Sequence, residues 1–566
     1  MRNVRNEVKL LHVAIIVTTG IIAYLCCTSA GFLSLDDVDL VQGLTTSEFS
    51  LHRLLFSGAG EYFRPLPFIS YASDAHLFGG GAAWFHGVNL AIHLLNGILV
   101  YLLMLYLGGE SDRNTFAALT AALIFTLHPL NTEAVMWVSA RPDLLCCFFS
   151  LISLILMCQI KEYPRFLSLG CLFLAYLFSL FSKESSIFLL LVVPLYLLCE
   201  GRKQEWKKVV LITAPFFAAV LVWLFLRSGK KAVLDSGISK VLTTVVVTNQ
   251  DHTKFLNTLA AYGFYLKKLI LPFPLNFAIV DFNKTIAFTV LSLSAVVAVY
   301  LFGRNRLSRL PLLMVFAGIA PPVAAYVAKL PWTPFAERYL YLPMVGFSLL
   351  LALLVFNIPK MSRILPVSLA LLLAIPTIYR VSLWADPVAF WNDIVVKSPR
   401  FSRSYVCLAT ALFEVRDYDA AERSLDKARA MGYDEVPLWD NLAAVYYAKR
   451  DYPRYEDAMI KLASISPDPG GIYIKLIGNI TSIPESEMDR RTVYDKAIGY
   501  YLKILEKNPS FHLSYYNIGK LYLAMGEREN AAHYLGLFLS KAKNDPLRPF
   551  ARKMLDRITS ATGLSG

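Results

Sequence analysis

Residues 84–107 read WFHGVNLAIHLLNGILVYLLMLYL, an apolar run that contains a few neutral polar side chains and no Asp, Glu, Lys or Arg. About 20 consecutive apolar residues are enough for a helix to cross the hydrocarbon core of a bilayer, which is about 30 Å thick. The run exceeds that length. It therefore predicts a membrane-spanning helix.

The same pattern recurs on both sides of this segment. Of the 566 residues, 56% are hydrophobic and 17% are charged, which departs from a soluble domain in the direction of a membrane protein. This composition excludes a simple soluble enzyme, a disordered protein and a disulfide-rich secreted module. Besides 84–107, apolar runs lie between the N-terminus and Ala30 and at about 115–131, 143–160, 166–182, 185–199, 208–227, 286–302, 310–328, 338–357 and 363–380.

These eleven runs predict an all-α, polytopic membrane domain with about 11 transmembrane helices. The first run is too long for the 7–15-residue core of a cleaved signal peptide, so we expect it to be an uncleaved span. A twelfth candidate, residues 255–272, is broken by Lys267 and Lys268. We interpret it as an interfacial or re-entrant helix.

The basic residues set an orientation. The net charge of +13 could suggest nucleic acid in a soluble protein, but here the basic residues cluster in short loops, which favours a topology signal and no nucleic-acid partner. The N-terminus and residues 202–208, 304–309 and 360–363 are predicted to be cytoplasmic. With eleven spans, the loops at about 31–83, 128–142, 183–184, 228–285 and 329–337 and everything after about residue 381 are then exoplasmic.

A repeat appears in the more polar C-terminal part. Leu408-Ala409 recurs as Leu442-Ala443, and Asp417-Tyr418 recurs as Asp451-Tyr452, both after 34 residues. This is the tetratricopeptide period, and stacked helix pairs of that kind form a binding surface; a generic helical bundle is the alternative. The Pro- and Gly-rich stretch 466–490 predicts a degenerate or interrupted repeat. We expect a membrane domain at 1–380, a linker at 381–400 and a repeat domain at 401–566.

Two adjacent carboxylates, Asp36 and Asp37, follow the first span. A carboxylate in a loop just above the lipid can stay ionised and accept a proton from an attacking hydroxyl. A solvated loop or a helix N-cap is the alternative for such a pair.

A polar stripe opens the second span. His86, Asn89, His93 and Asn96 recur at three- and four-residue steps and so share one helical face. The two histidines lie two turns apart, which is poor spacing for one metal ion, so we expect hydrogen-bonded packing between helices.

Further charged residues flank other spans on the predicted exoplasmic side. Each could pair locally or extend its charge to the membrane surface, but together they place carboxylates and cations at one membrane face, where cations can offset charge that develops on a phosphate leaving group. The candidates for substrate binding are Arg64, His128, Glu133, Arg141, Lys183, Glu184, Arg338 and Tyr339.

Several of these residues lie in motifs that resemble the transmembrane O-mannosyltransferases with tetratricopeptide repeats, which are glycosyltransferases of the GT-C class. The motifs are Asp36-Asp37, Phe63-Arg64-Pro65-Leu66, Phe85-His86 with Asn89, His93 and Asn96, His128-Pro129 with Thr132-Glu133-Ala134-Val135 and Arg141, Ser182-Lys183-Glu184, and Glu337-Arg338-Tyr339-Leu340-Tyr341-Leu342-Pro343. The resemblance covers nearly the whole chain, although residues 228–258 match weakly and the repeat array is short.

The resemblance implies a GT-C fold and transfer of a sugar, mannose by default, from a polyprenyl-phosphate donor to a protein hydroxyl on the exoplasmic side (EC 2.4.1 type). It implies that Asp36 is the general base, that Asp37 is its neighbour, and that Lys183 and Arg338 contact the donor phosphate. It favours a compact bacterial relative in the plasma membrane, with the N-terminus cytoplasmic and the repeats binding the acceptor protein on the exoplasmic side.

Two other functions stay open at this stage: a lipid-linked oligosaccharide ligase or polymerase, and a non-catalytic membrane scaffold. A transporter is disfavoured, because the sequence shows no paired, interrupted helices of the inverted-repeat kind. No metal site and no cofactor is predicted, although a divalent metal at the acidic pair remains an alternative.

Overall fold

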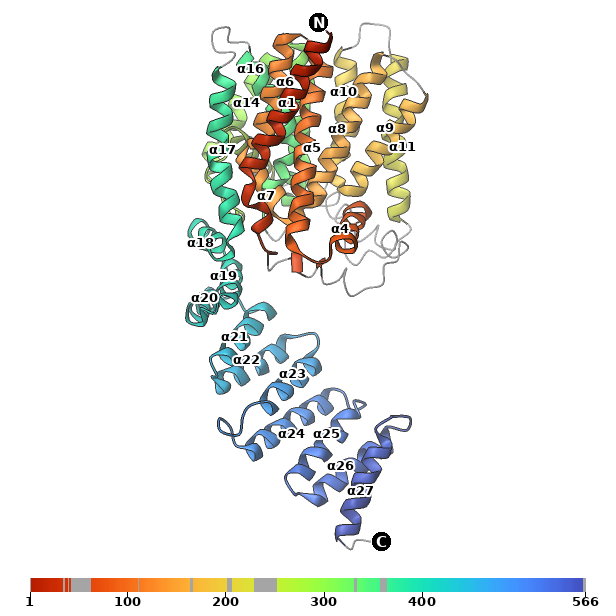
Figure 1. The fold of residues 1–566 in the computed structure, drawn as a ribbon, viewed down its shortest axis with the longest axis vertical. Helices are drawn as coiled ribbons and strands as arrows, with labels where there is room; N and C mark the ends of the chain where they lie inside the picture. The colour runs from red at the N-terminus through yellow and green to blue at the C-terminus, as the bar shows by residue number, and fades with distance from the viewer. Residues whose placement is uncertain are drawn as a thin grey trace. The chain divides into compact units, whose positions relative to one another are not determined.

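The structure is a computed structural model, and it describes residues 2–33, 36–38, 40–41, 63–109, 111–162, 166–200, 206–228, 252–329, 333–356 and 364–562. The chain divides into two compact units, Met1–Phe401 and Ser402–Gly566. Within the described residues both units are helical, and the β-structure is limited to an isolated bridge between Ile279 and Phe335. Figure 1 shows the helices of each unit.

A helix occupies each of the eleven apolar runs of the first unit, which confirms the predicted all-α class. They are α1 Arg2–Ala23, α5 Ala82–Gly108, α6 Asp112–Leu127, α8 Arg141–Glu162, α9 Phe166–Ser182, α10 Leu189–Glu200, α11 Trp206–Ser228, α14 Lys284–Arg304, α15 Arg309–Val327, α16 Tyr341–Phe356 and α17 Ile364–Ala385. Among the described residues, seven helical segments are long and apolar enough to cross a membrane. The chain is an integral membrane protein, and the number of eleven spans stays a prediction.

Further helices lie outside the eleven apolar runs. They are α4 Pro65–Phe78, α7 Thr132–Met136, α13 His252–Ile270 and α18 Pro387–Lys397, with 3₁₀ turns η1 Leu25–Ser29, η2 Pro129–Asn131, η3 Val138–Ala140, η4 Glu184–Phe188, η7 Arg306–Ser308 and η8 Glu337–Leu340. Helix α13 covers the segment interpreted as interfacial or re-entrant. Figure 1 shows the N-terminus at one end of the first unit and α4 at the other.

The predicted linker 381–400 is helical. It contains the end of α17 and the whole of α18, and it belongs to the first unit. Asp386 caps α18, because its Oδ1 accepts hydrogen bonds from the backbone N–H groups of Val388 (3.0 Å) and Ala389 (3.1 Å). Phe390 and Trp391 are buried on α18, so apolar packing as well as the cap holds this segment.

The polar stripe on α5 packs against neighbouring helices, as expected. His93 is buried, with Nε2 3.0 Å from the carbonyl oxygen of Thr126 on α6 and Nδ1 2.7 Å from the Tyr341 hydroxyl on α16. The Asn96 amide donates to the carbonyl of Leu144 on α8 (3.0 Å). These hydrogen bonds satisfy polar groups that would be costly if left unpaired among apolar helices.

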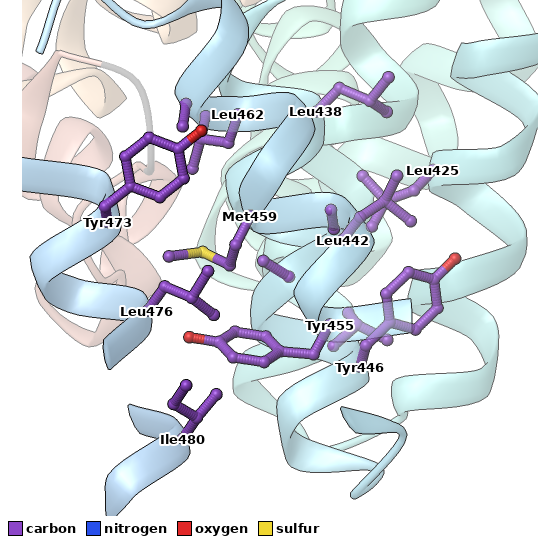
Figure 2. Close-up of a cluster of buried hydrophobic side chains, with 14 of the residues drawn as sticks. Leu425, Leu438, Leu442, Tyr446, Tyr455, Met459, Leu462, Tyr473, Leu476 and Ile480 are labelled. Carbon is purple, nitrogen blue, oxygen red and sulfur yellow. The ribbon is translucent and has the colours of Figure 1, made fainter. Parts of the chain in front are cut away.

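The second unit is a series of antiparallel helix pairs with one further helix at the end. The pairs are α19 Ser402–Glu414 with α20 Tyr418–Ala430, α21 Val436–Ala448 with α22 Tyr452–Ile465, α23 Pro469–Thr481 with α24 Arg490–Lys507, and α25 Leu513–Ala524 with α26 Arg528–Lys541, and the last helix is α27 Arg548–Thr562. Figure 2 shows Leu425, Leu442 and Met459 among the buried side chains between the first pairs. The 34-residue period thus corresponds to a solenoid-like stack of helix pairs.

For residues 466–490 the sequence left a degenerate or an interrupted repeat open. The structure places helix α23 in this stretch, so the array continues through it. Pro469 opens α23 in the first turn, and the Asp468 side chain caps it by accepting a hydrogen bond from the Gly471 backbone N–H (3.0 Å). Proline is well accommodated in a first helical turn, because the N–H that it lacks would have no partner there. The irregularity lies in the longer connection between α23 and α24.

Candidate active site

The acidic pair after the first helix has two unlike members. Asp36 is exposed, whereas Asp37 is 1% exposed. One carboxylate oxygen of Asp37 accepts hydrogen bonds from the backbone N–H (2.9 Å) and hydroxyl (2.5 Å) of Ser139, and the other accepts one from the Leu33 N–H (3.2 Å). Asp37 therefore fixes the loop against η3, and Asp36 is the member that solvent can reach.

Burial raises the pKa of Asp37 to about 6, and the neighbouring charge of Asp36 adds to the rise. The hydrogen bonds from Ser139 and Leu33 stabilise the ionised form and oppose the shift. Asp37 is thus a buried carboxyl whose proton is held more tightly than usual, which suits it to positioning.

Arg141 follows η3 and is the first residue of α8. It is 0% exposed, and its guanidinium donates to Asn89 Oδ1 (2.7 Å), Ser70 Oγ (2.9 Å) and the carbonyl of Phe85 (3.0 Å). Its Nη1 also lies 2.5 Å from Asp74 Oδ2. Arg141 joins α4, α5 and α8, and this position favours positioning the site over contact with a substrate.

Three ion pairs lie near one another at this site. Arg64 pairs with Glu184, Lys183 Nζ lies 2.6 Å from Asp143 Oδ1, and Arg338 Nη1 lies 2.5 Å from Glu133 Oε1. The charges of Arg64 and Arg338 both act on Lys183, so the three cations are electrostatically coupled. We call Arg64, Lys183 and Arg338 the cation cluster.

Tyr339 lies between two of these cations. Its ring centroid is 5.0 Å from Lys183 Nζ and 4.8 Å from the guanidinium carbon of Arg338, and Arg338 also stacks over Trp137 at 4.6 Å. Aromatic faces stabilise such cations by about 0.5–2 kcal/mol. These ring contacts hold the ammonium and the guanidinium in place beside their carboxylate partners.

Exposure decreases across the pairs. The side chains of Arg64 and Glu184 are 19% and 29% exposed, those of Lys183 and Arg338 are 10% exposed, and that of Glu133 is 0% exposed. Burial lowers the pKa of Lys183; Asp143 opposes this shift, and Arg64 and Arg338 add to it. An anion beside the cation cluster would relieve this mutual repulsion.

Glu184 remains ionised at this edge of the cluster. Burial favours its neutral form, but the charge and hydrogen bonds of Arg64 outweigh burial and lower its pKa to about 2. Glu184 therefore holds Arg64 in place as a permanent anion.

His128 and Glu133 lie deeper. His128 is 3% exposed, its Nδ1 accepts a hydrogen bond from the Leu130 N–H (3.3 Å), and burial lowers its pKa to about 3. Glu133 accepts from the Glu337 N–H (3.0 Å) as well as from Arg338. Burial raises the pKa of Glu133, although Arg338 opposes this. Both residues shape the backbone behind the cation cluster, and neither presents a group to solvent.

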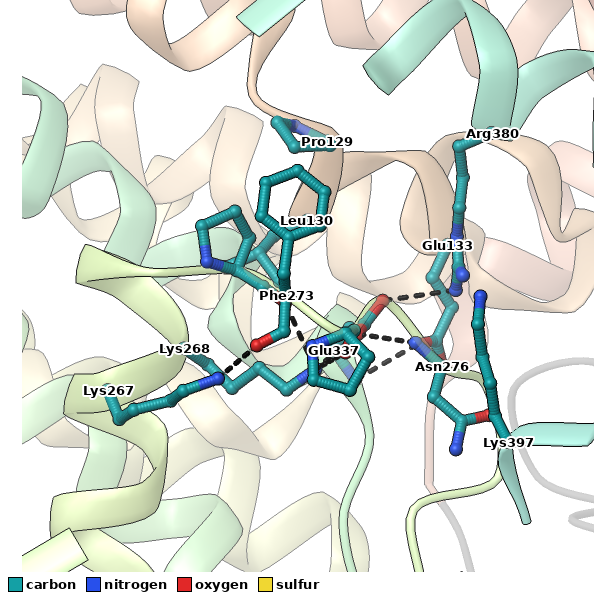
Figure 3. Close-up of polar contacts among 12 residues, drawn as sticks. Pro129, Leu130, Glu133, Lys267, Lys268, Phe273, Asn276, Glu337, Arg380 and Lys397 are labelled. Carbon is teal, nitrogen blue, oxygen red and sulfur yellow. Dashed lines mark hydrogen bonds and ion pairs between the residues drawn. The ribbon is translucent and has the colours of Figure 1, made fainter. Parts of the chain in front are cut away.

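Glu337 forms a second network beside Arg338, shown in Figure 3. It is buried and accepts from Lys268 Nζ (2.8 Å), Arg380 Nη2 (3.1 Å) and the Asn276 N–H (2.8 Å). These partners come from α13, α17 and the segment after α13. The network fixes η8, the turn that carries Arg338 and Tyr339.

The partners of Glu337 could not be predicted from the sequence, because nothing local relates Lys268 or Arg380 to it. Asp143, the partner of Lys183, has a weak signal, since it is an acid in the first turn of a span. Within the described part of the chain, no group of three His, Cys, Asp or Glu side chains could hold a metal ion.

Comparison with known proteins gives relatives of one kind. The chain is 22% identical over 435 residues to protein O-mannosyl-transferase F38B6.6 of Caenorhabditis elegans, covering 71% of this chain and 60% of that protein. It is 28% identical over 233 residues to protein O-mannosyl-transferase Tmtc2 of Drosophila melanogaster, covering 39% of this chain and 24% of that protein. Over 130 residues, it is 29% identical to human protein O-mannosyl-transferase TMTC1, covering 23% of this chain and 14% of that protein.

The matched region thus spans at most 60% of the length of these three relatives. No family model matches the chain. The relatives all carry the name of the enzyme class that the sequence motifs pointed to. The resemblance of this chain to the protein O-mannosyl-transferases is therefore confirmed.

Proposed function

We propose that the chain is an integral-membrane glycosyltransferase that moves a sugar, mannose in the first instance, from a polyprenyl-phosphate donor to a protein hydroxyl on the exoplasmic side. The observation that carries the proposal is the cation cluster, held by three ion pairs, in a chain that also presents the exposed Asp36 beside the fixed Asp37. The names of the relatives support the same reaction class.

In this reaction the acceptor hydroxyl oxygen attacks the anomeric carbon of the sugar. The bond between that carbon and the phosphate oxygen breaks, and polyprenyl phosphate leaves with one additional negative charge. Asp36 accepts the proton of the attacking hydroxyl. Arg64, Lys183 and Arg338 offset the charge that develops on the leaving phosphate, which is the larger electrostatic requirement.

Other side chains position these groups. Asp37 and Ser139 hold the loop that carries Asp36, and Arg141 binds η3 and α8 to α4 and α5. Tyr71, on α4, contacts both η3 and the start of α8. Its hydroxyl donates to the Val138 carbonyl (2.8 Å), and its ring lies 4.5 Å from the Arg141 guanidinium carbon. Glu133 and Glu184 orient Arg338 and Arg64.

The second unit supplies the acceptor-binding part of the proposal, because stacked helix pairs offer an extended surface for a polypeptide. We place the N-terminus in the cytoplasm and the repeats on the exoplasmic side of a bacterial plasma membrane. The basic short loops support this orientation.

The test is transfer of labelled mannose from synthetic polyprenyl-phosphate mannose to an acceptor peptide by the full chain in liposomes. Asp36→Asn should keep the fold and lower the rate by roughly 10²–10⁴-fold, the usual contribution of a general base. Asp112→Asn, which removes another exposed carboxylate of the same unit, is the matched control and should keep full activity. An Asp36→Asn chain with normal activity would sink the proposal.

Intact-mass analysis of the product separates this function from the oligosaccharide ligase or polymerase. A single hexose on the acceptor supports the proposal, and a whole glycan supports the alternative.

A further inference from the structure

A cavity of about 300 Å³ opens in the first unit between α13, the segment after it, the start of α14 and the end of α18. Its apolar lining includes Phe264, Ile279, Phe282 and Ile286, and its charged lining comprises Lys267, Lys268, Lys397 and Asp281. None of the residues of the three ion pairs lines it. The cavity is therefore distinct from the proposed catalytic groups.

The three lysines of the cavity differ in how many donors they have left. Lys268 is 3% exposed, and its ammonium donates to Glu337 and to the carbonyls of Pro272 (3.2 Å) and Pro274, which uses its three N–H groups. Lys267 donates to the Phe273 carbonyl, and Lys397 pairs with Asp393 at 2.7 Å while remaining 27% exposed. Lys267 and Lys397 thus keep further N–H donors for an anion, whereas Lys268 lines the cavity with all its donors already used.

The apolar side of the cavity continues onto α14. Ile286 lines the cavity and shares one helical face with Leu293, Val297 and Tyr300, which follow it at steps of seven, four and three residues. These four side chains are 51%, 63%, 50% and 57% exposed. Because α14 is also long and apolar enough to span a membrane, this face is suited to lipid chains.

Lysines above an apolar wall, at the end of a lipid-facing helix, are the features that recognise a phosphate-bearing lipid. We propose that this cavity binds the headgroup phosphate of an anionic phospholipid of the surrounding membrane, with its acyl chains along the Ile286 face of α14. The donor lipid is a different occupant, since its phosphate is assigned to the cation cluster. The proposal goes beyond glycosyl transfer and is tested without it.

The experiment uses the purified full chain in mixed micelles that contain equal amounts of phosphatidylglycerol and phosphatidylcholine. Native mass spectrometry counts the lipids of each kind that stay bound. Two variants attack the cavity in different ways: Lys267→Gln with Lys397→Gln removes the charges, and Ile286→Trp fills the apolar wall. Lys207→Gln with Lys208→Gln, at the start of α11, removes the same charge outside the cavity and is the control.

The wild type and the control should retain one phosphatidylglycerol in preference to phosphatidylcholine. The double lysine variant should lose that preference by about 30-fold, the factor that two lysines near a membrane surface contribute. Ile286→Trp should lower retention of phosphatidylglycerol while thermal stability stays at the wild-type value.

If the wild type and both cavity variants retained phosphatidylglycerol with the same preference over phosphatidylcholine, the proposal would be wrong. It would also be wrong if polyprenyl phosphate, added well below the phosphatidylglycerol concentration, displaced phosphatidylglycerol from the wild type, because the cavity would then prefer a donor-type lipid to a membrane phospholipid. A failure of the mannose-transfer assay leaves this binding result unaffected, so the two proposals fail separately.

Discussion

Asp36 and Asp37 are neighbours in sequence, yet the fold gives them opposite surroundings. Asp37 is buried and accepts three hydrogen bonds, two from Ser139 in η3 and one from Leu33, whereas Asp36 is exposed. The sequence indicated that an acidic pair was important but could not say which member was reachable. That distinction depends on Ser139, about a hundred residues further along the chain.

The raised pKa of Asp37 gives a pH dependence of stability. Between its ordinary value of 3.8 and about 6, the native state binds more protons than the unfolded state, so the free energy of unfolding falls as pH rises through this range. A shift of this size corresponds to roughly 3 kcal/mol. Asp37→Asn does not titrate and should lack this fall.

Thermal unfolding of the detergent-purified chain at pH 4–8 checks this. The stability of the wild type relative to Asp37→Asn should decline between about pH 4 and pH 6 and stay level above pH 7. Parallel profiles for the two chains would show that Asp37 titrates normally.

The Lys183–Asp143 pair allows stability and function to be separated. Lys183→Met leaves the Asp143 carboxylate, 10% exposed, without its cation, and breaking such a pair costs about 3–5 kcal/mol. Replacing both, Lys183→Met with Asp143→Leu, should recover most of that stability.

Mannose transfer should nevertheless stay at least about tenfold below wild type in the double variant, because one phosphate-facing cation is missing. Recovery of transfer together with stability would mean that Lys183 only packs the site.

The helices were largely predictable from sequence, because apolar length and period depend on local residues. All eleven runs in the first 380 residues contain a helix. Residues 466–490 show the limit of this local signal: Pro469, Gly470 and Gly471 indicated a degenerate or interrupted repeat, whereas Asp468 and Pro469 start α23. Cap and breaker residues are the same residue types, and only their position relative to the helix separates the two roles.

The network around Glu337 was beyond sequence reasoning for the opposite reason. Lys268, Asn276 and Arg380 lie between 43 and 69 residues from Glu337, and a charge in one element carries no local mark of its partner in another. The cations that could meet a phosphate were identified from motifs and local pairing was left open, but the sequence could not assign Asp143 to Lys183 or Glu133 to Arg338.

Helix α13 packs against α14 at a glycine. A Cβ built on Gly263 would lie 1.9 Å from the backbone oxygen of Ala287, so Gly263→Ala must push the two helices apart. We expect a loss of about 1–3 kcal/mol, the usual cost of overpacking. Gly303→Ala, on α14 with open space around it, should be neutral or up to about 1 kcal/mol more stable.

Thermal melting of both variants in the same detergent measures the contrast. If Gly263→Ala melts with the wild type, the close approach of α13 to α14 is wrong.

In the whole molecule, the two units differ in how they are stabilised and in what they offer to a ligand. The first unit places charged groups among apolar helices, where each must be paired, and the second offers a stack of soluble helix pairs. The matched region reaches at most 60% of the length of the three relatives described above, so what the longer proteins do with the rest of their length is not transferred to this chain.

The proposed reaction requires that Asp36 and the repeats face one compartment, opposite the N-terminus, since base, donor phosphate and acceptor must meet on one side of the bilayer. The direct measurement is labelling with a membrane-impermeant maleimide in a chain whose eight native cysteines are replaced. Single cysteines are introduced by Glu7→Cys, Asp36→Cys and Asn508→Cys, three exposed positions. We predict that positions 36 and 508 are labelled in intact cells and that position 7 is labelled only after permeabilisation; labelling of positions 36 and 508 from opposite sides of the membrane would show that the proposed topology is wrong.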